Sequence, residues 1–509
     1  MVTVLDNNPK SSVFSKVLVI NFARLGDIIQ AQPLISLLKK QKKMVGLCVL
    51  EAFAEICNLV QDLDQVFVFP GSKILACLDK KNWTSSLDLL WSFVHTIQKD
   101  FYPDEVLNLT PTLPARLLTL LFPQAKIKGF GLDEHGFSTY SNDWAAFLDS
   151  SATVRNSSAL NLVDLNLGIE DEAKKHAQTL RLKKPDPKLV EFWKNKLNSK
   201  QLIGFQLGAS DLKRTWPVEY FVKLGRLCAQ KGLFPVLLGG AREIELGKSF
   251  SQKADFPFYN LIGKTTLQDV NAILQLLNFL ITNDTGPMHL AVGQGRKIIA
   301  LFLATAQAWD TGPYQTNCIC LEPNISCHPC NFNTSCPEYK CRWKIKPDIV
   351  FAFIENYYLS QISCLDVRAY RVVLKDNLFS LNRLQTDDRR FEVMSCLQKL
   401  YASFLAKQPV PSNLFLPQEL AQEIDFICQA FQVFQTQLKT LTFLPSKIRQ
   451  QKINTFYQTL DQRLQKCTWL KALHRLWLVN SQSSLVLDDL LDLSLRYFTF
   501  WSACLKNKQ

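Results

Sequence analysis

Short apolar runs alternate with longer amphipathic segments along the first 170 residues. The runs have the length of buried strands, and the segments repeat apolar residues at the three- and four-residue spacing of helices that cover a sheet. Strands that alternate with helices indicate a parallel sheet with helices on its faces. The predicted strands are 17–21, 45–50, 66–69 and 106–109, and the predicted helices are 28–40, 86–99 and 113–122.

The alternation stops at residues 171–200, which are charged and interrupted by prolines, and then resumes. We interpret this interruption as a linker followed by the first helix of a second domain. Two such halves predict two facing doubly wound, Rossmann-like domains with a cleft at the carboxyl edges of their sheets. The predicted strands of the second half are 202–206, 235–238, 279–282 and 298–303, and its predicted helices are 218–230, 242–252, 267–277 and 347–358.

Residues 365–509 have a different pattern. They begin with a short alternating stretch and continue as long amphipathic segments, which predict a third, mostly α-helical domain. Nothing in this part points to chemistry. The long segments are 391–407, 417–439, 447–466 and 485–504. The predicted division of the chain is therefore 1–170, 171–358 and 359–509.

Composition and charge narrow the class of partner. The chain has 58 Lys and Arg against 45 Asp and Glu, a net charge of +13, which favours an anionic partner. The basic residues are spread along the chain without a nucleic-acid motif, so we expect no nucleic-acid partner. The longest apolar run, 298–304, is too short to span a bilayer, and the amino terminus lacks a signal-peptide pattern. We expect a cytoplasmic protein with mostly reduced, buried cysteines.

The loop after the predicted strand 279–282 carries the clearest chemistry. Asp284, Thr285 and Gly286 lie at the carboxyl end of this strand, and His289 falls just inside the following helix. Backbone N–H groups and the helix dipole favour an anion at such a point, and these side chains suit a sugar diphosphate. The alternative is a capped turn, with Asp284 or Thr285 as the N-cap and His289 merely packed.

Gly26 and Asp27 follow the predicted strand 17–21. Gly26 allows a tight turn, and Asp27 emerges at the amino end of the next helix. There Asp27 is either a carboxylate that caps the helix or a general base that takes a proton from an acceptor hydroxyl. The spacing of the residues leaves both interpretations open.

Two further loops carry charged side chains. Lys213 and Arg214 precede a predicted helix, where a cation holds a diphosphate and neutralises a leaving group, unless the two are only a surface pair. Glu243 and Glu245 follow the turn after strand 235–238, and their spacing does not separate a ligand contact from a helix-start carboxylate. Thr266 is expected to cap the helix 267–277.

Four cysteines cluster towards the end of the second half, and the first two form a Cys-x-x-Cys pair. Such a pair suits a structural metal, but the later spacings are not those of a zinc ribbon. Reduced structural thiols and a disulfide are the alternatives, and no other metal or cofactor is expected. The candidates are Cys327, Cys330, Cys336 and Cys341.

Three motifs can be compared with known families. They are Ala23-Arg24-Leu25-Gly26-Asp27-Ile28-Ile29, Gly208-Ala209-Ser210 with Lys213-Arg214-Thr215-Trp216-Pro217, and Asp284-Thr285-Gly286-Pro287-Met288-His289-Leu290-Ala291. Together, and in this order, they resemble the heptosyltransferase family of bacterial glycosyltransferases, glycosyltransferase family 9, over about residues 16–357. The resemblance implies a GT-B type fold and makes Asp27 the catalytic base.

The same resemblance implies a set of substrate-binding residues. The family's lysine stands two residues before the tryptophan, where this chain has Arg214, so both Lys213 and Arg214 remain candidates for the phosphate contact. The implied residues are Gly26, Ser210, Lys213, Arg214, Glu243, Thr265, Asp284, Thr285, Gly286, Pro287, Met288 and His289.

The function implied by the resemblance is an inverting glycosyltransferase that needs no metal. The expected donor is an ADP-heptose-like nucleotide sugar, and the expected acceptor is the lipopolysaccharide core or a related surface glycan. An anionic glycolipid acceptor would place the protein peripherally at the cytoplasmic face of the inner membrane. Two alternatives are a non-catalytic nucleotide-sugar binder and a scaffold that binds a protein through residues 365–509.

Overall fold

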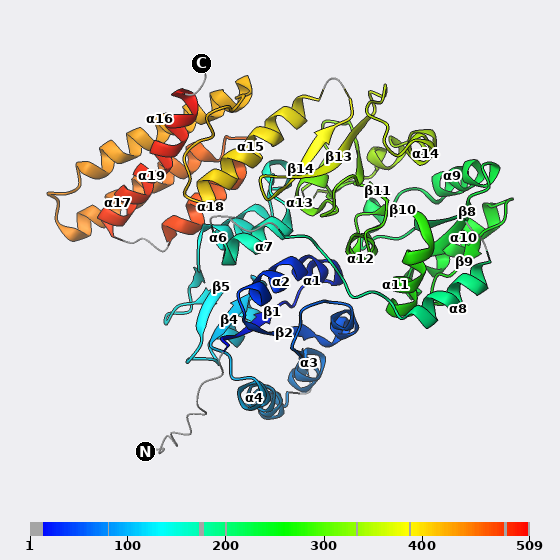
Figure 1. The fold of residues 1–509 in the computed structure, drawn as a ribbon. Helices are drawn as coiled ribbons and strands as arrows, with labels where there is room; N and C mark the ends of the chain where they lie inside the picture. Colours follow the sequence, from blue (N-terminus) through cyan, green and yellow to red (C-terminus); the bar gives the residue numbers. More distant parts are fainter. Residues whose placement is uncertain are drawn as a thin grey trace. The chain divides into compact units, whose positions relative to one another are not determined.

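The computed structural model describes residues 14–79, 81–172, 178–198, 201–331, 334–385, 388–482 and 486–506. By its internal contacts the chain divides into two compact units (Figure 1). The first comprises Met1–Ala23 and Leu34–Thr139, and the second comprises Arg24–Pro33 and Tyr140–Gln509. The short segment that follows the first strand therefore belongs to the second unit.

The first unit contains a six-stranded sheet with the order β3-β2-β1-β4-β5-β6. Neighbours from β3 to β5 pair in parallel, and Leu18 of β1 lies opposite Gly46 of β2 and Val106 of β4. The order reverses at β1, as in mononucleotide-binding α/β folds. The strands are β1 (Lys16–Ile20), β2 (Met44–Leu50), β3 (Gln65–Phe69), β4 (Glu105–Asn108), β5 (Lys126–Leu132) and β6 (Ser138–Tyr140), and the helices are η1 (Glu51–Asn58), α3 (Gly71–Asp79), α4 (Trp83–Asp100) and α5 (Leu113–Thr119).

The predicted helix 28–40 is wrong in one respect, because the structure has two helices there. α1 (Leu25–Gln30) ends at Ala31, and α2 (Gln32–Lys40) begins immediately afterwards. Pro33 explains the break, since its ring has no N–H to donate and clashes with the preceding turn of a continuous helix. The break leaves α1 as a short helix of six residues, with Asp27 in its first turn.

The second unit contains an eight-stranded sheet with the order β14-β13-β12-β11-β10-β7-β8-β9. The strands from β9 to β12 pair in parallel, and β13 and β14 are antiparallel to their neighbours. The parallel part again reverses at its first strand, between β7 and β10. The strands are β7 (Leu202–Gln206), β8 (Phe234–Leu238), β9 (Tyr259–Asn260), β10 (Leu277–Asn283), β11 (Ile298–Leu301), β12 (Ile319–Pro323), β13 (Val367–Lys375) and β14 (Leu378–Arg383).

Helices cover this second sheet, and the boundaries of α9, α10, α11 and α14 lie within three residues of the predicted ones. They are α8 (Pro187–Leu197), α9 (Val218–Gln230), α10 (Ile244–Lys253), α11 (Leu267–Leu276), α12 (Gly286–Gly293), α13 (Ala308–Thr311) and α14 (Pro347–Glu355), with short 3-10 helices η3 (Leu212–Arg214), η4 (Ala241–Glu243) and η5 (Lys340–Trp343). The two strand orders confirm the predicted Rossmann-like sheets.

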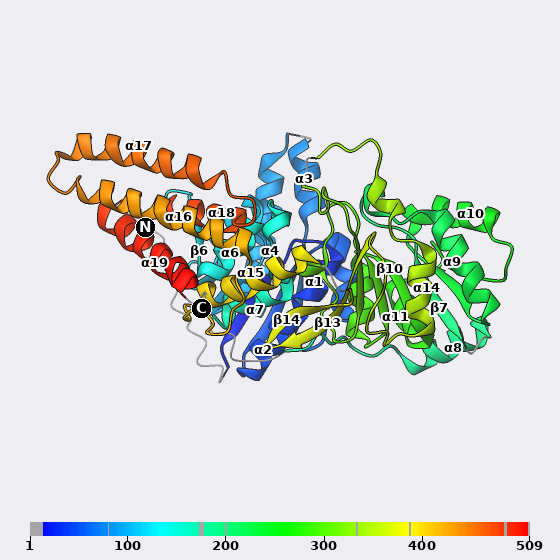
Figure 2. The ribbon, with the colours of Figure 1, turned by 90° about the horizontal axis from the view of Figure 1, so that it is seen from above.

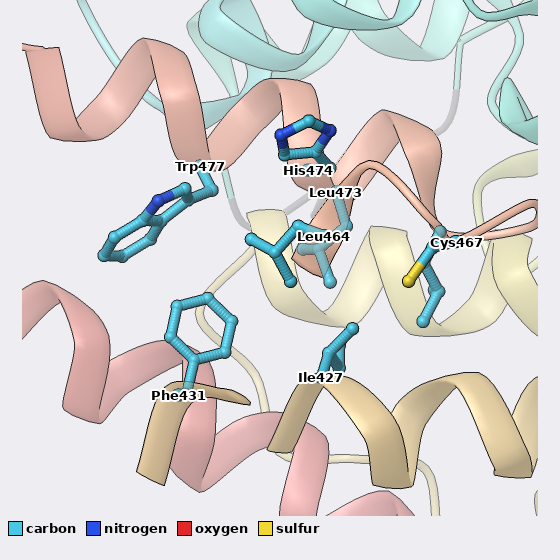
Figure 3. A pocket seen from close by; sticks show the side chains of 8 residues that line it. Ile427, Phe431, Leu464, Cys467, Leu473, His474 and Trp477 are labelled. Carbon is cyan, nitrogen blue, oxygen red and sulfur yellow. The ribbon is translucent and has the colours of Figure 1, made fainter. Parts of the chain in front are cut away.

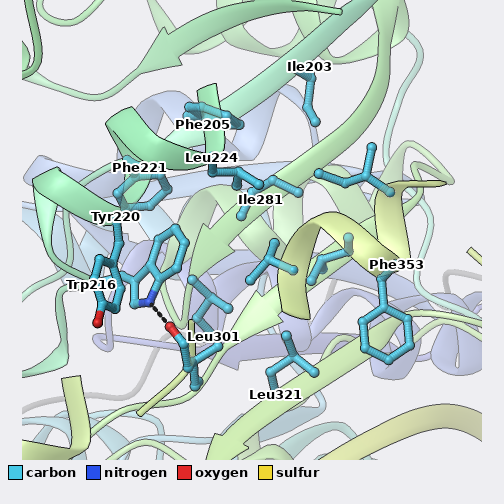
Figure 4. Packing of buried hydrophobic residues seen from close by; sticks show 14 of the residues in the cluster. Ile203, Phe205, Trp216, Tyr220, Phe221, Leu224, Ile281, Leu301, Leu321 and Phe353 are labelled. Atoms are coloured by element: carbon cyan, nitrogen blue, oxygen red, sulfur yellow. Dashed lines mark hydrogen bonds between the residues drawn. The ribbon is translucent and has the colours of Figure 1, made fainter. Parts of the chain in front are cut away.

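An apolar core packs between the second sheet and the helices α9 and α14 (Figure 4). Phe221 of α9 and Phe353 of α14 are fully buried in it. Trp216 is also fully buried and donates its indole N–H to the Ile345 carbonyl oxygen at 2.9 Å. Trp216 is thus an anchor for the loop that precedes α9, which carries Lys213 and Arg214.

Residues beyond 358 do not form helices only. The alternating stretch after residue 365 forms β13 and β14, and β13 extends the second sheet through its antiparallel pairing with β12. Residues 143–170, predicted as part of the first domain, form α6 (Asp143–Ser151), η2 (Arg155–Ser157) and α7 (Leu162–Glu170), which belong to the second compact unit. The three-domain division at residues 170 and 358 therefore stays a prediction.

The carboxyl-terminal region is mostly helical, as predicted, and packs α16 against α17 and α19 (Figure 2). Side chains from α16, α17 and α18 meet in its interior, in a gap too narrow for a water molecule (Figure 3). α18 was not predicted. The helices are α15 (Arg389–Leu405), α16 (Gln418–Lys439), α17 (Ser446–Leu464), α18 (Lys471–Gln482) and α19 (Leu487–Lys506). None of the described helices combines the length and apolarity needed to cross a bilayer.

Candidate active site

The loops at the reversal point of the second sheet bring together most of the predicted site residues. In open α/β sheets, ligands bind outside the carboxyl ends of the strands at the point where the strand order reverses. Here that point lies between β7 and β10. Residues 207–214 follow β7, and Asp284 and Thr285 follow β10. The segments that the sequence singled out therefore share one edge of one sheet.

Asn283, the last residue of β10, ties these two loops together. Its side-chain amide donates hydrogen bonds to the carbonyl oxygens of Leu207 at 3.0 Å and Gly208 at 3.2 Å. Its side-chain oxygen accepts the Trp216 backbone N–H at 2.9 Å. Asn283 is fully buried. Sequence reasoning missed this residue, because its position beside Asp284 said nothing about the loop after β7.

Replacing Asn283 with alanine is expected to lower the free energy of unfolding by about 2–4 kcal/mol, because buried polar groups of both loops lose their partners. Chemical denaturation followed by circular dichroism measures this change. Asn454 of α17 is exposed and provides the matched control, for which we expect a change within about 0.5 kcal/mol. Equal stability of the Asn283→Ala protein and the wild type would show that Asn283 does not stabilise the two loops.

At the amino end of α12, the backbone lies close to Leu25. Thr285 occupies the N-cap position, but its side chain makes no capping hydrogen bond, and Pro287 stands in the first turn. A Cβ on Gly286 would lie 2.5 Å from Leu25 Cδ2, so glycine is required unless Leu25 moves. Met288 is fully buried. The interpretation of Thr285 as a side-chain cap is therefore wrong, and its hydroxyl is left for another role.

His289 is a buried neutral imidazole beside α1. It is 3% exposed, and burial lowers its pKa to about 4, against a smaller raising effect from Asp284. A Cβ on Gly26 would lie 3.1 Å from His289 Cδ2, so α1 and α12 meet at Gly26. Nδ1 of His289 has no hydrogen-bond partner among the described residues. His289 thus packs against the turn of the first motif and holds one unpaired ring nitrogen.

Asp27 lies in the same cluster as the loop after β10. Burial raises its pKa, and the negative charge of Asp284 adds to this effect. The hydrogen bond that Asp27 Oδ2 accepts from the Arg24 N–H at 3.1 Å and the charges of Arg24 and Arg214 act in the opposite direction. Asp27 therefore holds the start of α1. It also lies close enough to Asp284 and Arg214 for their charges to shift its pKa. The role of general base remains a proposal.

Arg214 is the cation that the fold brings to the loop after β10. Its guanidinium forms an ion pair with the Asp284 carboxylate and donates to the Asp284 carbonyl oxygen at 3.0 Å. It also donates to the Ser210 hydroxyl at 3.3 Å. Lys213 instead pairs with Asp211, with Nζ 3.2 Å from the carboxylate. The geometry therefore favours Arg214 over Lys213 as the residue at the candidate diphosphate position.

The structure also separates the two glutamates. Glu243 Oε2 accepts the Gly240 N–H at 2.7 Å, and a Cβ on Gly208 would lie 2.3 Å from Glu243 Cγ. Glu243 thus turns towards the loop after β7, whereas Glu245 pairs with Lys248 on the exposed side of α10 at 2.8 Å. Of the two, only Glu243 is placed with the candidate site.

The two threonines in the loop before α11 have different surroundings. Thr266 caps α11 as predicted, because its hydroxyl accepts the Asp269 N–H at 3.2 Å. The buried hydroxyl of Thr265 has no hydrogen-bond partner among the described residues. Thr265 therefore remains the candidate for a ligand contact in this loop.

A second polar network borders the site and was not predicted. The Thr311 hydroxyl donates to Asp284 Oδ2 at 3.2 Å and to the Gln307 carbonyl oxygen at a similar distance. Gln307 in turn accepts from Arg390 of α15 at 2.8 Å and donates to Asp310, whose pKa burial raises to about 6. Arg390 lies beyond residue 365, so the carboxyl-terminal region reaches within two side chains of Asp284. No sequence spacing could have revealed this link.

The cysteine candidates are close enough to influence one another. Burial raises the pKa of Cys330 to about 11, with smaller contributions from Cys341, Cys327 and Cys336. All 15 cysteines carry free thiols. Among the described residues, no three His, Cys, Asp or Glu side chains are arranged to hold a metal ion. The disulfide alternative is therefore not what the structure has, and a metal at this cluster stays a prediction.

Two Rossmann-like sheets, with polar loops at the reversal point of the second, define a protein of the GT-B fold class. Residues 90–341, just under half of the chain, match the family model described as glycosyltransferase family 9 (heptosyltransferase). The first motif, at residues 23–29, precedes the matched range. Its assignment to the site rests on the contact between Gly26 and His289.

Individual relatives cover less of the chain. A lipooligosaccharide heptosyltransferase 2 of Campylobacter jejuni is 28% identical over 204 residues, which are 39% of this chain and 61% of that protein. A protein of the same description from Haemophilus influenzae is 30% identical over 115 residues, 22% of this chain and 33% of its own length. The chain thus matches under two thirds of the length of these relatives.

A solved structure supports the fold. The crystal structure of a glycosyl transferase family 9 protein from Veillonella parvula superposes with a TM-score of 0.56 at 20% sequence identity, covering 69% of this chain and 99% of that one. At this identity the likeness concerns the fold alone. It confirms the predicted GT-B type architecture, and the remaining part of this chain lies outside the superposition.

Proposed function

We propose that the protein is an inverting glycosyltransferase that transfers a heptose-like sugar from an ADP-heptose-like donor to an acceptor hydroxyl of a lipopolysaccharide core or a related anionic surface glycan. The match to the family model and the heptosyltransferase descriptions of the relatives support this class of donor and acceptor. The observation that carries the proposal is the cluster of Asp27, Arg214, Asp284 and His289 at the reversal point of the second sheet.

In the proposed reaction, the acceptor oxygen attacks the anomeric carbon of the donor as its proton passes to an Asp27 carboxylate oxygen. A new bond forms between that carbon and the acceptor oxygen, and the bond between the carbon and the diphosphate oxygen breaks. Direct displacement from the opposite side inverts the anomeric centre. A raised pKa suits Asp27 to this task, because a more basic carboxylate is a stronger proton acceptor.

The leaving nucleoside diphosphate needs positive charge where its bond breaks. Arg214, held by Asp284 and Ser210, supplies a fixed guanidinium, and the amino end of α12 adds backbone N–H groups and a positive dipole end. Asp284 also keeps the guanidinium oriented. Neutral His289 contributes no charge and packs the turn at Gly26. Arg214 and the amino end of α12 would together stabilise the departing diphosphate.

The donor pocket would be completed by the loops after β8 and before α11. Glu243 is proposed to accept from the nucleoside ribose, and the unpaired Thr265 hydroxyl to contact the nucleotide. Thermal unfolding in the presence of ADP, UDP, GDP and their sugars tests this part. We expect stabilisation by ADP and ADP-heptose, and then ADP release once a heptose-deficient core glycolipid is added. Binding without release for any acceptor would instead identify a non-catalytic binder.

The rate is expected to depend on pH through Asp27. Because burial raises the pKa of Asp27 above the ordinary 3.8, kcat/KM should rise with unit slope through that raised pKa and then level off. His289 contributes no limb above pH 5, since its pKa is about 4. A kcat/KM profile from pH 4 to 9, with the Asp27→Asn protein as control, measures this. An acid limb that persists in the control would assign the titration to another group.

A further inference from the structure

The hairpin between α16 and α17 has an unusual charge pattern. No Asp or Glu occurs between Asp425 and Asp461, although 45 of the 509 residues are acidic. The cations of this stretch gather at residues 439–452, which we call the hairpin tip: Lys439, Lys447, Arg449 and Lys452. The tip is therefore a cationic surface with no carboxylate of its own.

The hairpin tip also exposes apolar side chains. Phe443 lies in the connection between the two helices and is 93% exposed, and Ile448 in the first turn of α17 is 45% exposed. Neighbouring Leu441 is fully buried, so the connection is anchored from one side. Lys439, Lys447 and Lys452, which lie within nine residues of Phe443 in the sequence, are exposed as well. The connection between α16 and α17, at one end of the hairpin (Figure 2), thus exposes an aromatic ring in a stretch whose lysines are also exposed.

The connection is held in this shape by Arg449. Its guanidinium donates to the carbonyl oxygens of Thr442 at 3.2 Å and Leu444 at 2.9 Å, the two residues that flank Phe443. These two hydrogen bonds order the backbone on both sides of Phe443, whose side chain is exposed. A pre-formed exposed ring costs less ordering on binding than a flexible one. The exposure is therefore built into the hairpin.

We propose that the hairpin tip docks onto an anionic lipid surface, with Phe443 entering the headgroup region and the lysines contacting lipid phosphates. Exposed aromatic side chains together with clustered cations suit the interface of an acidic bilayer. Single-stranded nucleic acid is instead bound along grooves in which several aromatic side chains stack with successive bases, whereas residues 439–452 contain one aromatic residue, Phe443. The overall charge of +13 acts in the same direction.

This inference goes beyond the proposed transferase activity and does not depend on it. Vesicle binding is measured without donor or acceptor, so a protein that transfers no sugar can still bind and one that binds no vesicle can still transfer. The hairpin tip lies in residues outside the range matched by the family model. Its role is therefore a property of this chain's carboxyl-terminal region.

The test is cosedimentation of the full chain with vesicles of phosphatidylglycerol and phosphatidylethanolamine, compared with pure phosphatidylcholine vesicles. We expect binding to the acidic vesicles only, weakened as ionic strength rises. The triple variant Lys439→Gln/Lys447→Gln/Lys452→Gln should lower the partition coefficient by about a hundredfold at low salt, since each cation near the surface contributes about a factor of five. Phe443→Ser should lower it by about tenfold.

Two matched controls separate the tip from bulk charge and bulk hydrophobicity. Lys99→Gln/Lys126→Gln/Lys188→Gln removes the same charge from exposed lysines elsewhere, and Phe137→Ser removes another ring, 70% exposed, in the first unit. Both should bind as the wild type does within about threefold. Unchanged thermal midpoints establish that all variants are folded. Equal loss in the two triple variants, wild-type binding by Phe443→Ser, or tip-dependent binding of single-stranded RNA without vesicle binding would each overturn the proposal.

Discussion

Asparagine at position 27 is expected to lower kcat by about a hundredfold or more while the affinity for the donor stays nearly constant, because a general base of this kind typically contributes at least that factor. Asn has the shape of Asp27 and keeps an oxygen that can accept the Arg24 N–H, which Asp27 accepts at 3.1 Å. It lacks the basicity to take the acceptor proton. The measurement is steady-state ADP release together with donor titration by calorimetry.

The stability of the Asp27→Asn protein distinguishes a lost base from a damaged fold. Since the folded-state pKa of Asp27 is raised, the stability that the protonated group provides at low pH is lost as pH rises through that value. At neutral pH the ionised carboxylate is therefore a cost, and the neutral variant should be at least as stable as the wild type. Asp79→Asn, at an exposed position of α3, is the matched control and should keep full activity. A rate within about threefold of the wild type would reject the general-base role.

Methionine in place of Arg214 is expected to lower kcat/KM by about a hundredfold or more, which is the usual scale for one group that stabilises developing charge. The loss follows because the guanidinium that faces the loop after β10 is the only cation that the described contacts join to Asp284. Lys213→Met is the matched control. Lys213 pairs with Asp211 instead, and we expect its loss to change kcat/KM by less than about fivefold.

A second variant distinguishes the loss of the Arg214 charge from the destabilisation caused by leaving Asp284 unpaired. Asp284 is 5% exposed, and removing its ion-pair partner leaves a buried charge, which typically costs about 3–5 kcal/mol. The double variant Arg214→Met/Asp284→Asn should regain most of this stability and none of the activity. If the double variant regains activity as well, Arg214 acts only by compensating the buried charge of Asp284. If Lys213→Met is the more damaging change, the phosphate contact belongs to Lys213.

Much of the fold was accessible from local pattern. The strand β7 and the helix α9 were predicted to the residue, because both are strongly periodic segments between polar turns. The break at Pro33 and the helix α18 were missed for local reasons, the first because an apolar pattern continues across the proline and the second because its neighbours share its composition. The strands β13 and β14 were seen as an alternating pattern, but their place in the second sheet depends on pairing with β12, which is a non-local contact.

The candidate site was predicted as a set of residues and not as an arrangement. Sequence motifs named Asp27, Asp284 and His289, and the structure brings all three into one cluster. The motifs could not show that Asn283 links the loops after β7 and β10. Nor could they show that Arg390, which lies beyond residue 365, joins the hydrogen-bond network beside Asp284. These contacts join positions far apart in the chain, and no spacing rule links such positions.

The sequence by itself determined, to within one residue, where β1–β4, β7, β8 and β10 end and which chemical groups follow them, because the periodicity of apolar residues and the chemistry of turns are local properties. It also indicated the resemblance to glycosyltransferase family 9 through motifs that lie in a fixed order, and residues 90–341 match that family's model. Only the tertiary structure showed that Arg214 contacts Asp284 and that Glu243 lies beside Gly208, because these positions are far apart in the chain. The raised pKa of Asp27 was likewise decided there, because burial and the nearby charge of Asp284 exist only once the chain has folded.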